Sequence, residues 1–438
     1  MKIKQIIKNK LDKLLLSSGF KKIFVNISWL FFERIIGMIV SFFVGVYVAR
    51  YLGPENFGLF SYSVSFVGLF AAITTLGLDS IVIRELVKDE KKRDELLGTS
   101  FALKIIGSFL VIGIIFIAVR FTNNDNFTNF LIYIIAIGTL FQSFNVINFH
   151  FQSKVLSKYT VYAQIFTSIT CAAIKLLLIY FRMSLVYFVI VSLIQSVILA
   201  LGLIVMYIKQ KSNLFNWIIN FSLAKRLLQD SWPLILSGIA ISIAMRIDQV
   251  MLKEYMGNIH VGYYAVGVRL AEILIFIPMA IGQSFFPKII KLDFIKEKNF
   301  LLLLFRIFFL LALIAIGVNL LSKYIILFLF GEIYSLSTVV LNILIWTIPF
   351  TYFGIITNKL LLSLNLQKLI FYKQLSLTII NICLNIILIP KYGITGAALS
   401  TLTADIIINI FYECLFRETR WLFNLKIQSL LFLKGVNS

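Results

Sequence analysis

The sequence predicts an all-α integral membrane protein, with about 12 transmembrane helices in two parallel-repeat six-helix bundles around a central cavity. The composition, the length of the apolar runs and an internal repeat predict this fold. Of the 438 residues, 60% are hydrophobic and 14% are charged, and the mean hydropathy is +0.95. Soluble domains carry about 25% charged residues. The chain lacks that polar surface, so we expect it to lie in a bilayer.

The apolar runs are long enough to cross a membrane, which takes about 20 residues in a helix. Residues 324–330 are apolar but too short, and we interpret them as an interfacial extension of the ninth span. Residues 122–129, 182–184 and 391–393 are predicted to be tight turns. The predicted spans are residues 23–49, 57–82, 97–119, 127–149, 158–181, 184–207, 231–252, 260–286, 300–320, 338–358, 369–389 and 393–416.

The two ends of the chain are basic. Residues 1–22 contain seven lysines, with Ile3, Ile7 and Leu11 at helical spacing among them. This pattern predicts a basic amphipathic tail on an anionic cytoplasmic leaflet. If the N-terminus lies in the cytoplasm, the cytoplasmic tails and loops together contain roughly five times as many Lys and Arg residues as the outer loops do. The sequence therefore predicts both ends inside, with residues 417–438 as a second basic cytoplasmic tail.

The same charge distribution accounts for most of the net charge of +21 without nucleic acid. The cysteines and histidines show no metal-ligand spacing, and no catalytic motif is present. We therefore predict a protein that is not an enzyme, with no resident metal and no bound cofactor.

The chain divides after the sixth predicted span. Residues 209–230 are the most polar internal connection and predict a cytoplasmic linker between bundles at 23–208 and 231–416. Ser231 as N-cap and Pro233 in the first turn predict the start of the seventh helix.

Two sequence motifs that recur at a fixed spacing indicate that the second bundle duplicates the first. Tyr51-Leu52-Gly53 with Gly58 recurs 204 residues later as Tyr255-Met256-Gly257 with Gly262. An even number of helices per half gives both halves the same orientation, and transporters built this way bind their cargo near mid-membrane between the repeats. Chance similarity between apolar sequences is the alternative. The second recurring motif is the set Lys158, Tyr162 and Gln164, which has its counterpart 210 residues later in Lys368, Tyr372 and Gln374.

Ionisable residues inside the apolar runs are the candidate site. Each costs roughly 2.5–3.5 kcal/mol at the bilayer centre, so such side chains usually face a cavity or a partner. Arg84 and Arg306 lie near predicted helix ends, where snorkelling to the interface explains them. The others are Glu33, Arg34, Asp79, Lys104, Lys175, Arg246, Asp248, Arg269, Glu272 and Asp405.

Spacing separates the two charge pairs of the second half. Arg269 and Glu272 are three residues apart and share a helix face, so they form either a structural ion pair or part of the site. Arg246 and Asp248 point about 200° apart on an ideal helix and cannot satisfy each other. Snorkelling is the alternative for Arg246. Asp405 is either a proton or ion site or a buried hydrogen-bond partner.

The deep cations outnumber the deep anions, which suits an anionic cargo. Guanidinium groups bind phosphate through two hydrogen bonds at once. Pro278 and Pro349 are each expected to remove a hydrogen bond inside a helix, as flex points or as static kinks. We predict substrate contacts at Arg34, Lys104, Lys175, Arg246 and Arg269. We predict charge-partner or ion-coupling roles for Glu33, Asp248, Glu272 and Asp405.

Several short motifs make the sequence resemble the Wzx-type polysaccharide repeat-unit flippases, a branch of the multidrug/oligosaccharidyl-lipid/polysaccharide exporter superfamily. They occur in the expected order over about residues 23–416, and each alone is weakly specific. They are Tyr51-Leu52-Gly53-Pro54 with Phe57-Gly58-Leu59-Phe60, Gly77-Leu78 with Arg84-Glu85, Arg246-Ile247-Asp248-Gln249-Val250-Met251-Leu252, Gly262-Tyr263-Tyr264-Ala265 with Arg269-Leu270, Glu272 and Pro278, and Tyr392-Gly393-Ile394-Thr395-Gly396-Ala397-Ala398.

The resemblance implies a V-shaped cavity and a flippase of the bacterial inner membrane. Its cargo would be an undecaprenyl-diphosphate-linked oligosaccharide for O-antigen or capsule, moved to the outer leaflet by alternating access coupled to H⁺ or Na⁺. Membrane lipids, a polysaccharide polymerase and a chain-length regulator are the other partners implied. The alternatives are a cation-coupled multidrug exporter of the same superfamily and a non-catalytic scaffold of a polysaccharide synthase complex. A membrane-embedded glycosyltransferase would need a large external loop, and the predicted external loops are short.

Overall fold

The computed structural model describes residues 18–289 and 297–431, and they contain helices and no β-strand. The predicted all-α membrane fold is confirmed: within these residues, ten helices are long and apolar enough to cross a membrane. In lipid, a helix satisfies its own backbone hydrogen-bonding groups, which favours this class for such a sequence. The predicted amphipathic segment at the N-terminus lies mostly outside the described residues.

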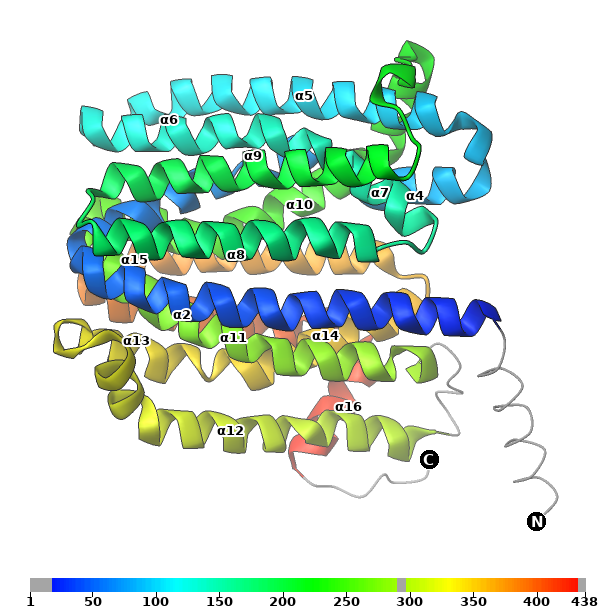
Figure 1. The fold of residues 1–438 in the computed structure, drawn as a ribbon. Coiled ribbons are helices and arrows are strands. Elements are labelled where there is room, and N and C mark those ends of the chain that lie inside the picture. The colour runs from blue at the N-terminus through cyan, green and yellow to red at the C-terminus, as the bar shows by residue number, and fades with distance from the viewer. Residues whose placement is uncertain (1–17, 290–296, 432–438) are drawn as a thin grey trace. The chain divides into compact units, whose positions relative to one another are not determined.

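The chain forms two compact units, described separately. The first unit comprises residues up to Val48 and Phe70–Leu236, and the second comprises Ala49–Leu69 and the residues from Ser237 onward. In the first unit, α5, α6 and α9 lie side by side (Figure 1). Its elements are α2 (Ser18–Gly68) up to Val48, α3 (Ala71–Thr75), α4 (Leu78–Lys88), α5 (Arg93–Ala118), α6 (Asn126–Phe141), α7 (Val146–Ser153), α8 (Lys158–Tyr180), α9 (Leu185–Lys209), the start of α10 (Phe221–Met256), and the 3₁₀ turns Glu90–Lys92, Val119–Phe121, Gln142–Asn145 and Leu214–Asn216.

The second unit takes the remainder of α2 and of α10. In it, α12 packs against α14 and also contacts α16, the helix nearest the C-terminus (Figure 1). Its other elements are α11 (Asn258–Ile289), α12 (Lys298–Phe330), α13 (Ser337–Leu344), α14 (Thr347–Ser363), α15 (Gln367–Ile406), α16 (Arg420–Leu430), a π-helical turn at Ile407–Phe411, and the 3₁₀ turns Glu332–Tyr334 and Tyr412–Leu415.

Each unit has its own apolar core. In the first, Leu97, Phe151 and Tyr207 are fully buried. In the second, Phe305 and Phe353 are buried with ring centroids 5.6 Å apart. Large apolar side chains also cover the outside, as expected where the neighbour is lipid instead of water.

The predicted turn at residues 391–393 and the predicted break between the first two spans each coincide with a kink at a glycine. Gly53 in α2 (φ 68°, ψ 172°) and Gly393 in α15 (φ 57°, ψ −130°) are the non-helical residues of those helices. The ten candidate spans therefore include two, Ser28–Gly68 and Gln367–Leu415, each much longer than one crossing needs. The ninth predicted span also continues unbroken through residues 324–330, as part of α12. The count of 12 helices stays a prediction.

The predicted span 57–82 is wrong as one helix. It is interrupted after Gly68 and again at Leu76 and Gly77, which have φ of 52° and 59°. A left-handed backbone cannot continue a right-handed helix. The predicted span 338–358 corresponds to α13 and α14, which are separated by two residues with right-handed backbone and together form one candidate span, Ser337–Ser363.

The predicted start of the seventh helix is also wrong. α10 begins at Phe221, and the Asn220 side chain accepts a hydrogen bond from the Leu223 backbone N–H at 3.1 Å, as an N-cap does. Ser231 lies inside the helix and donates to the Leu228 carbonyl. The last ten residues of the predicted linker are therefore helical, and Pro233 is inside α10.

The prediction for Pro349 is wrong as well. Pro349 is the third residue of α14, in its first turn. Backbone N–H groups there have no partner within the helix, so the proline removes no helical hydrogen bond.

Candidate functional site

The site is built around the carboxylate of Asp248 in α10, which is 6% exposed. It accepts hydrogen bonds from Tyr264 Oη at 2.7 Å, from Asn385 Nδ2 at 2.6 Å and from Thr401 Oγ1 at 2.6 Å. All three donors are neutral. They come from α11 and from the two parts of α15 that flank Gly393.

The polar network continues along α15. Asn385 Nδ2 also donates to Asn381 Oδ1 at 3.1 Å, and Asn381 Nδ2 lies 3.4 Å from Thr401 Oγ1. Along a straight helix, residues 20 apart are separated by about 30 Å. The contact between Asn381 and Thr401 therefore requires the chain to reverse near Gly393.

One oxygen of this network accepts no hydrogen bond. Asn385 Oδ1 is fully buried and has no partner in the described part of the chain, although the Asn385 amide nitrogen donates twice. Buried polar atoms without a hydrogen-bond partner are rare in folded proteins, and a bound water or ion is one physical reason for them. The network therefore offers a carboxylate together with several neutral oxygens.

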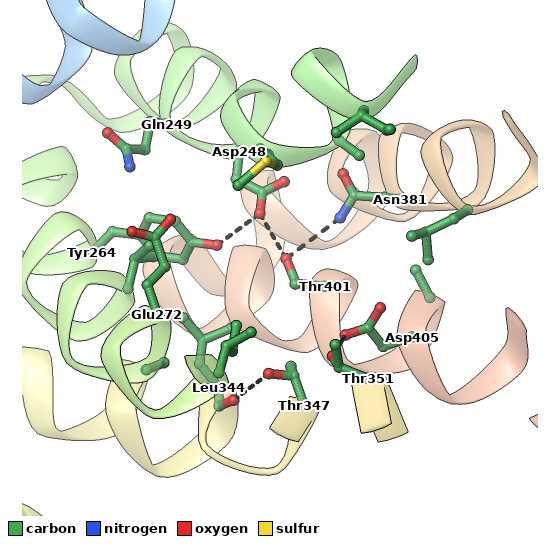
Figure 2. Close-up of a pocket in the computed structure, with 18 of the residues that line it drawn as sticks. Asp248, Gln249, Tyr264, Glu272, Leu344, Thr347, Thr351, Asn381, Thr401 and Asp405 are labelled. Atoms are coloured by element: carbon green, nitrogen blue, oxygen red, sulfur yellow. Dashed lines mark hydrogen bonds between the residues drawn. The ribbon is translucent and has the colours of Figure 1, made fainter. Parts of the chain in front are cut away.

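Asp248 lies on the wall of a pocket of about 280 Å³ in the second unit. Figure 2 shows Asp248, Glu272 and Asp405 around this pocket, with Tyr264, Asn381 and Thr401 beside Asp248. Asp405 accepts a hydrogen bond from Thr351 Oγ1 at 3.2 Å. Three predicted acidic residues thus meet at one pocket, and its chemistry favours a cation.

The predicted basic residues lie elsewhere. Arg246 and Arg269 belong to the second unit but are not among the residues that line the pocket. The side chain of Arg246 lies against Gly68, where an added Cβ would be 3.4 Å from Arg246 Cγ. The three donors to Asp248 do not include Arg246, in agreement with the helical geometry of that pair.

Four predicted site residues lie in the first unit. Arg34 is exposed and Glu33 is half-buried. Lys104 is buried, with its Nζ 3.6 Å from Asp79 Oδ1 and 4.8 Å from the centroid of the Phe149 ring. Lys175 is partly buried on α8.

Tyr264, Asn381 and Asn385 are members of the site that are not predicted from the sequence. Two asparagines four residues apart lie on one helix face. Such a pair inside an apolar run was a usable signal, because amides are costly to bury without partners. Tyr264 belongs to the Gly262-Tyr263-Tyr264-Ala265 motif, but the motif does not indicate that its hydroxyl donates to a buried carboxylate.

A buried charge cluster formed by Lys373, Glu413 and Lys426 is also not predicted from the sequence. Glu413 accepts from Lys373 Nζ at 2.7 Å and from Lys426 Nζ at 2.6 Å, and the three side chains are at most 4% exposed. Lys426 also donates to the Asn409 carbonyl at 2.6 Å. The predicted basic tail therefore contains a folded helix, α16, that is held by an ion pair.

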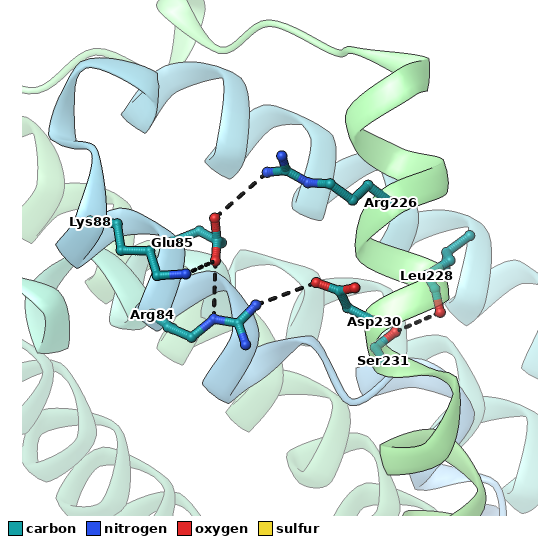
Figure 3. Close-up of polar contacts among 7 residues, drawn as sticks. All are labelled: Arg84, Glu85, Lys88, Arg226, Leu228, Asp230 and Ser231. Carbon is teal, nitrogen blue, oxygen red and sulfur yellow. Dashed lines mark hydrogen bonds and ion pairs between the residues drawn. The ribbon is translucent and has the colours of Figure 1, made fainter.

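A further charge cluster joins α4 to the start of α10 in the first unit (Figure 3). Glu85 accepts from Lys88 at 3.1 Å and from Arg84 at 3.0 Å, and lies 3.6 Å from Arg226. Arg84 also pairs with Asp230 at 3.3 Å. Arg84, predicted to snorkel, thus links two helices.

Replacing Glu85 with glutamine is expected to lower the stability of the first unit by about 1 kcal/mol or less, because exposed ion pairs contribute little. The hydrogen bond from Lys88 is the main cause that lowers the pKa of Glu85. A depressed folded pKa gives stability that is present above the unfolded pKa and is lost as the pH falls through the folded value. Thermal unfolding of the purified protein should therefore show a smaller acid-induced loss in the variant. An equal loss would contradict the prediction. Glu332→Gln, at an exposed carboxylate, is the control at neutral pH.

The chain is similar to known proteins along most of its length. It is 24% identical to the "Putative O-antigen transporter" of Shigella flexneri over 381 residues, which cover 81% of this chain and 88% of the relative. Its fold is similar to an inward-facing multidrug resistance MATE family transporter of the MOP superfamily, with a TM-score of 0.69, 16% identity, and coverage of 94% and 100% of the two chains. It is also similar to the lipid II flippase MurJ in an inward closed conformation, with a TM-score of 0.68, 18% identity, and coverage of 94% and 91%.

These neighbours share the helical transporter fold, and none of these likenesses points to an enzyme. The model of one family, described as polysaccharide biosynthesis protein, matches residues 23–293. This match includes α10 with Asp248 and the part of α11 that carries Tyr264. The chain belongs to the polysaccharide biosynthesis protein family.

Proposed function

We propose that this protein is a flippase that moves undecaprenyl-diphosphate-linked oligosaccharide repeat units from the inner to the outer leaflet of the bacterial cytoplasmic membrane, for O-antigen or capsule. The family match, the O-antigen transporter relative and the fold shared with a lipid II flippase support this proposal. Both ends of the chain would lie in the cytoplasm, as the positive-inside rule predicts.

The observation that carries a coupled transport mechanism is the buried Asp248 carboxylate with three neutral donors. An uncompensated buried anion is costly, so it favours binding a cation or a proton. The surrounding oxygens of Asn381, Asn385 and Thr401 are ligands of the kind that hard cations prefer. We propose that Na⁺ binds here, and that a proton on Asp248 is the alternative form of coupling.

The five predicted basic residues, Arg34, Lys104, Lys175, Arg246 and Arg269, remain our proposal for contacts with the diphosphate or with acidic sugars. Charge-assisted hydrogen bonds to phosphate are stronger than neutral ones, and arginine makes them in pairs. Glu33, Glu272 and Asp405 would orient these cations or carry protons.

The acidic pocket also supports a second candidate, a cation-coupled multidrug exporter. Asp248, Glu272 and Asp405 line one cavity, which suits a cationic cargo. The two candidates differ in phenotype. Loss of an exporter raises sensitivity to cationic drugs and leaves surface glycans normal, whereas loss of a flippase traps lipid-linked repeat units in the inner leaflet.

The test is a deletion strain complemented with wild type, Arg269→Ala or Gly317→Ala at matched membrane expression. We expect repeat units to accumulate on deletion, and Arg269→Ala to restore at most about a tenth of the surface polymer, since a charge-assisted hydrogen bond contributes about 1.5–3 kcal/mol. Gly317→Ala, which meets open space, should restore it fully. Normal surface polymer after deletion, with drug hypersensitivity, would favour the exporter. Full complementation by Arg269→Ala would remove that residue from the site.

A further inference from the structure

The internal repeat has a structural counterpart that composition alone would not explain. Gly53 and Gly257 occupy the same position of the repeated motif, and both have positive φ, 68° and 82°. Each ends one helical segment and precedes another. The repeated residues therefore place a left-handed φ between two helical segments in both copies.

The two copies of the motif also pack directly on each other, inside the second unit. A Cβ added to Gly58 would clash with the Asn258 carbonyl and lie 2.8 Å from the Gly262 nitrogen. A Cβ added to Gly262 would clash with the Pro54 carbonyl and lie 3.0 Å from Pro54 Cα. Pro54 and Asn258 are equivalent positions of the repeat, so the contact is reciprocal, as in a two-fold interface.

This contact holds residues 49–69, which belong to the first half by sequence, within the second unit. Tyr334 donates to the Ala49 carbonyl at 2.7 Å. Ser65 Oγ donates to Gln249 Oε1 at 2.9 Å, and both side chains are buried. Gln249 follows Asp248 in α10 and lines the same pocket. The segment is thus connected to the candidate cation site.

The chain crosses between the two units at three points, after Val48, Leu69 and Leu236. Each lies close to a break or weak point in a helix. Gly53 is non-helical, α2 ends at Gly68, and Pro233 interrupts the hydrogen bonding of α10. Segments bounded in this way can turn as rigid pieces, since hinges are a few residues at element ends that absorb the φ/ψ change.

We infer that residues 49–69 form a coupling arm, fixed to the second unit by the Gly58–Gly262 crossing, which transmits cation occupancy of the Asp248 pocket to the first unit. The inference rests on the proposed cation coupling. The crossing holds the arm rigidly in place, because the two backbones are in direct contact and no flexible side chain lies between them. The hydrogen bond from Ser65 to Gln249, which lines the pocket, links the arm to the cation site.

The test uses Gly58→Ala and Gly262→Ala, with Gly113→Ala and Gly317→Ala as matched controls whose Cβ atoms meet open space. Each is combined with a single reporter, Glu55→Cys, after the native cysteines are replaced by alanine. The full-length protein in nanodiscs is labelled with a maleimide, with and without Na⁺. Na⁺ binding is measured separately by thermal shift.

We expect Na⁺ to change the labelling rate at position 55 at least threefold in the reporter background and in the control variants. In Gly58→Ala and Gly262→Ala the change should fall below 1.5-fold, while Na⁺ affinity stays within about twofold. Ser65→Ala should reduce the change by an intermediate amount and keeps the packing intact if either glycine variant fails to fold.

The inference is overturned if Gly58→Ala and Ser65→Ala respond to Na⁺ as the controls do. It is also overturned if the reporter background itself shows no Na⁺ response at pH 8 and no proton response between pH 5 and pH 8. Failure of the flippase proposal looks different. In that case surface polymer is normal in the deletion strain, while the labelling response and its loss in the glycine variants persist.

Discussion

Asp248→Asn is expected to weaken cation binding by about tenfold to a hundredfold and to stop transport while the protein stays folded. A hydrogen bond or ion contact to a charged group contributes about 1.5–3 kcal/mol. The asparagine is nearly isosteric with the carboxylate, but it has no negative charge and one acceptor oxygen where Asp248 has two. Three donors, from Tyr264, Asn385 and Thr401, then compete for that oxygen.

The measurement is the stabilisation of the purified protein by Na⁺, with K⁺ as the reference salt. A ligand at a hundred times its Kd stabilises the native state by about 2.7 kcal/mol, and hundredfold weaker binding reduces this to about 0.4 kcal/mol. The Na⁺-dependent rise in Tm should therefore nearly disappear in Asp248→Asn. Undiminished stabilisation by Na⁺ would place the ion elsewhere.

Three further variants separate the contributions of individual side chains to Na⁺ binding. Thr401→Val and Asn385→Leu each remove one neutral group and should weaken binding less than Asp248→Asn does. Glu332→Gln removes an exposed carboxylate that does not line the pocket and should leave Na⁺ binding unchanged. If Na⁺ has no effect on wild type, while refolding at pH 8 takes up a proton in wild type and not in Asp248→Asn, Asp248 is instead a proton carrier.

Glu413→Gln is expected to destabilise the second unit by about 3–5 kcal/mol. Breaking a buried ion pair by removing one partner costs this much, because the remaining charge stays buried without compensation. Here two lysines share one carboxylate, so both are affected. Since α16 is anchored through Lys426, we expect this helix to detach first.

Thermal unfolding in detergent measures the effect, and Glu90→Gln is the control. Glu90 also pairs with a lysine, Lys154, but its side chain is 68% exposed, so its loss should cost little. Glu413→Met combined with Lys373→Met and Lys426→Met should recover most of the stability, because apolar replacement of a whole buried cluster is often neutral. If Glu413→Gln is as stable as Glu90→Gln, the cluster does not anchor α16.

The same cluster gives a pH dependence of defined sign. Burial, together with the nearby Lys373, lowers the pKa of Lys426 to about 7, although Glu413 raises it. Between pH 7 and about pH 10 the unfolded chain then binds more protons at Lys426 than the folded chain does, so the free energy of unfolding rises with pH. Lys426→Met should remove this rise. A steeper rise in that variant would contradict the assignment.

Residues with strong local signals were predictable. The helices follow from apolar runs that need no knowledge of distant contacts. Asp248, Glu272 and Asp405 were identified because an ionisable residue in such a run is costly wherever the helix packs. Their meeting at one pocket, separated from Arg246 and Arg269, was not predictable, because the order of charges along a chain does not set which of them share a cavity.

The errors also have local physical causes. The sequence predicts a start at Ser231 because a serine with a proline two residues later is a strong N-terminal signal, but Asn220 caps the same helix eleven residues earlier. The break inside the predicted span 57–82 depends on the positive φ angles of Leu76 and Gly77, which the run of apolar residues around them conceals, whereas the turn at residues 391–393 is predicted.

The sequence by itself determined that this chain is helical and embedded in a membrane, and it predicted an internal repeat, because hydrophobicity, helix length and motif spacing are carried by neighbouring residues. Only the tertiary structure decided that Asp248 meets Asn385 and Thr401, which are 137 and 153 residues away. It also decided that the two copies of the repeated glycine motif pack directly against each other. These contacts form only when the chain reverses and helices approach at glycine, and no local preference encodes which partners then come within hydrogen-bonding distance.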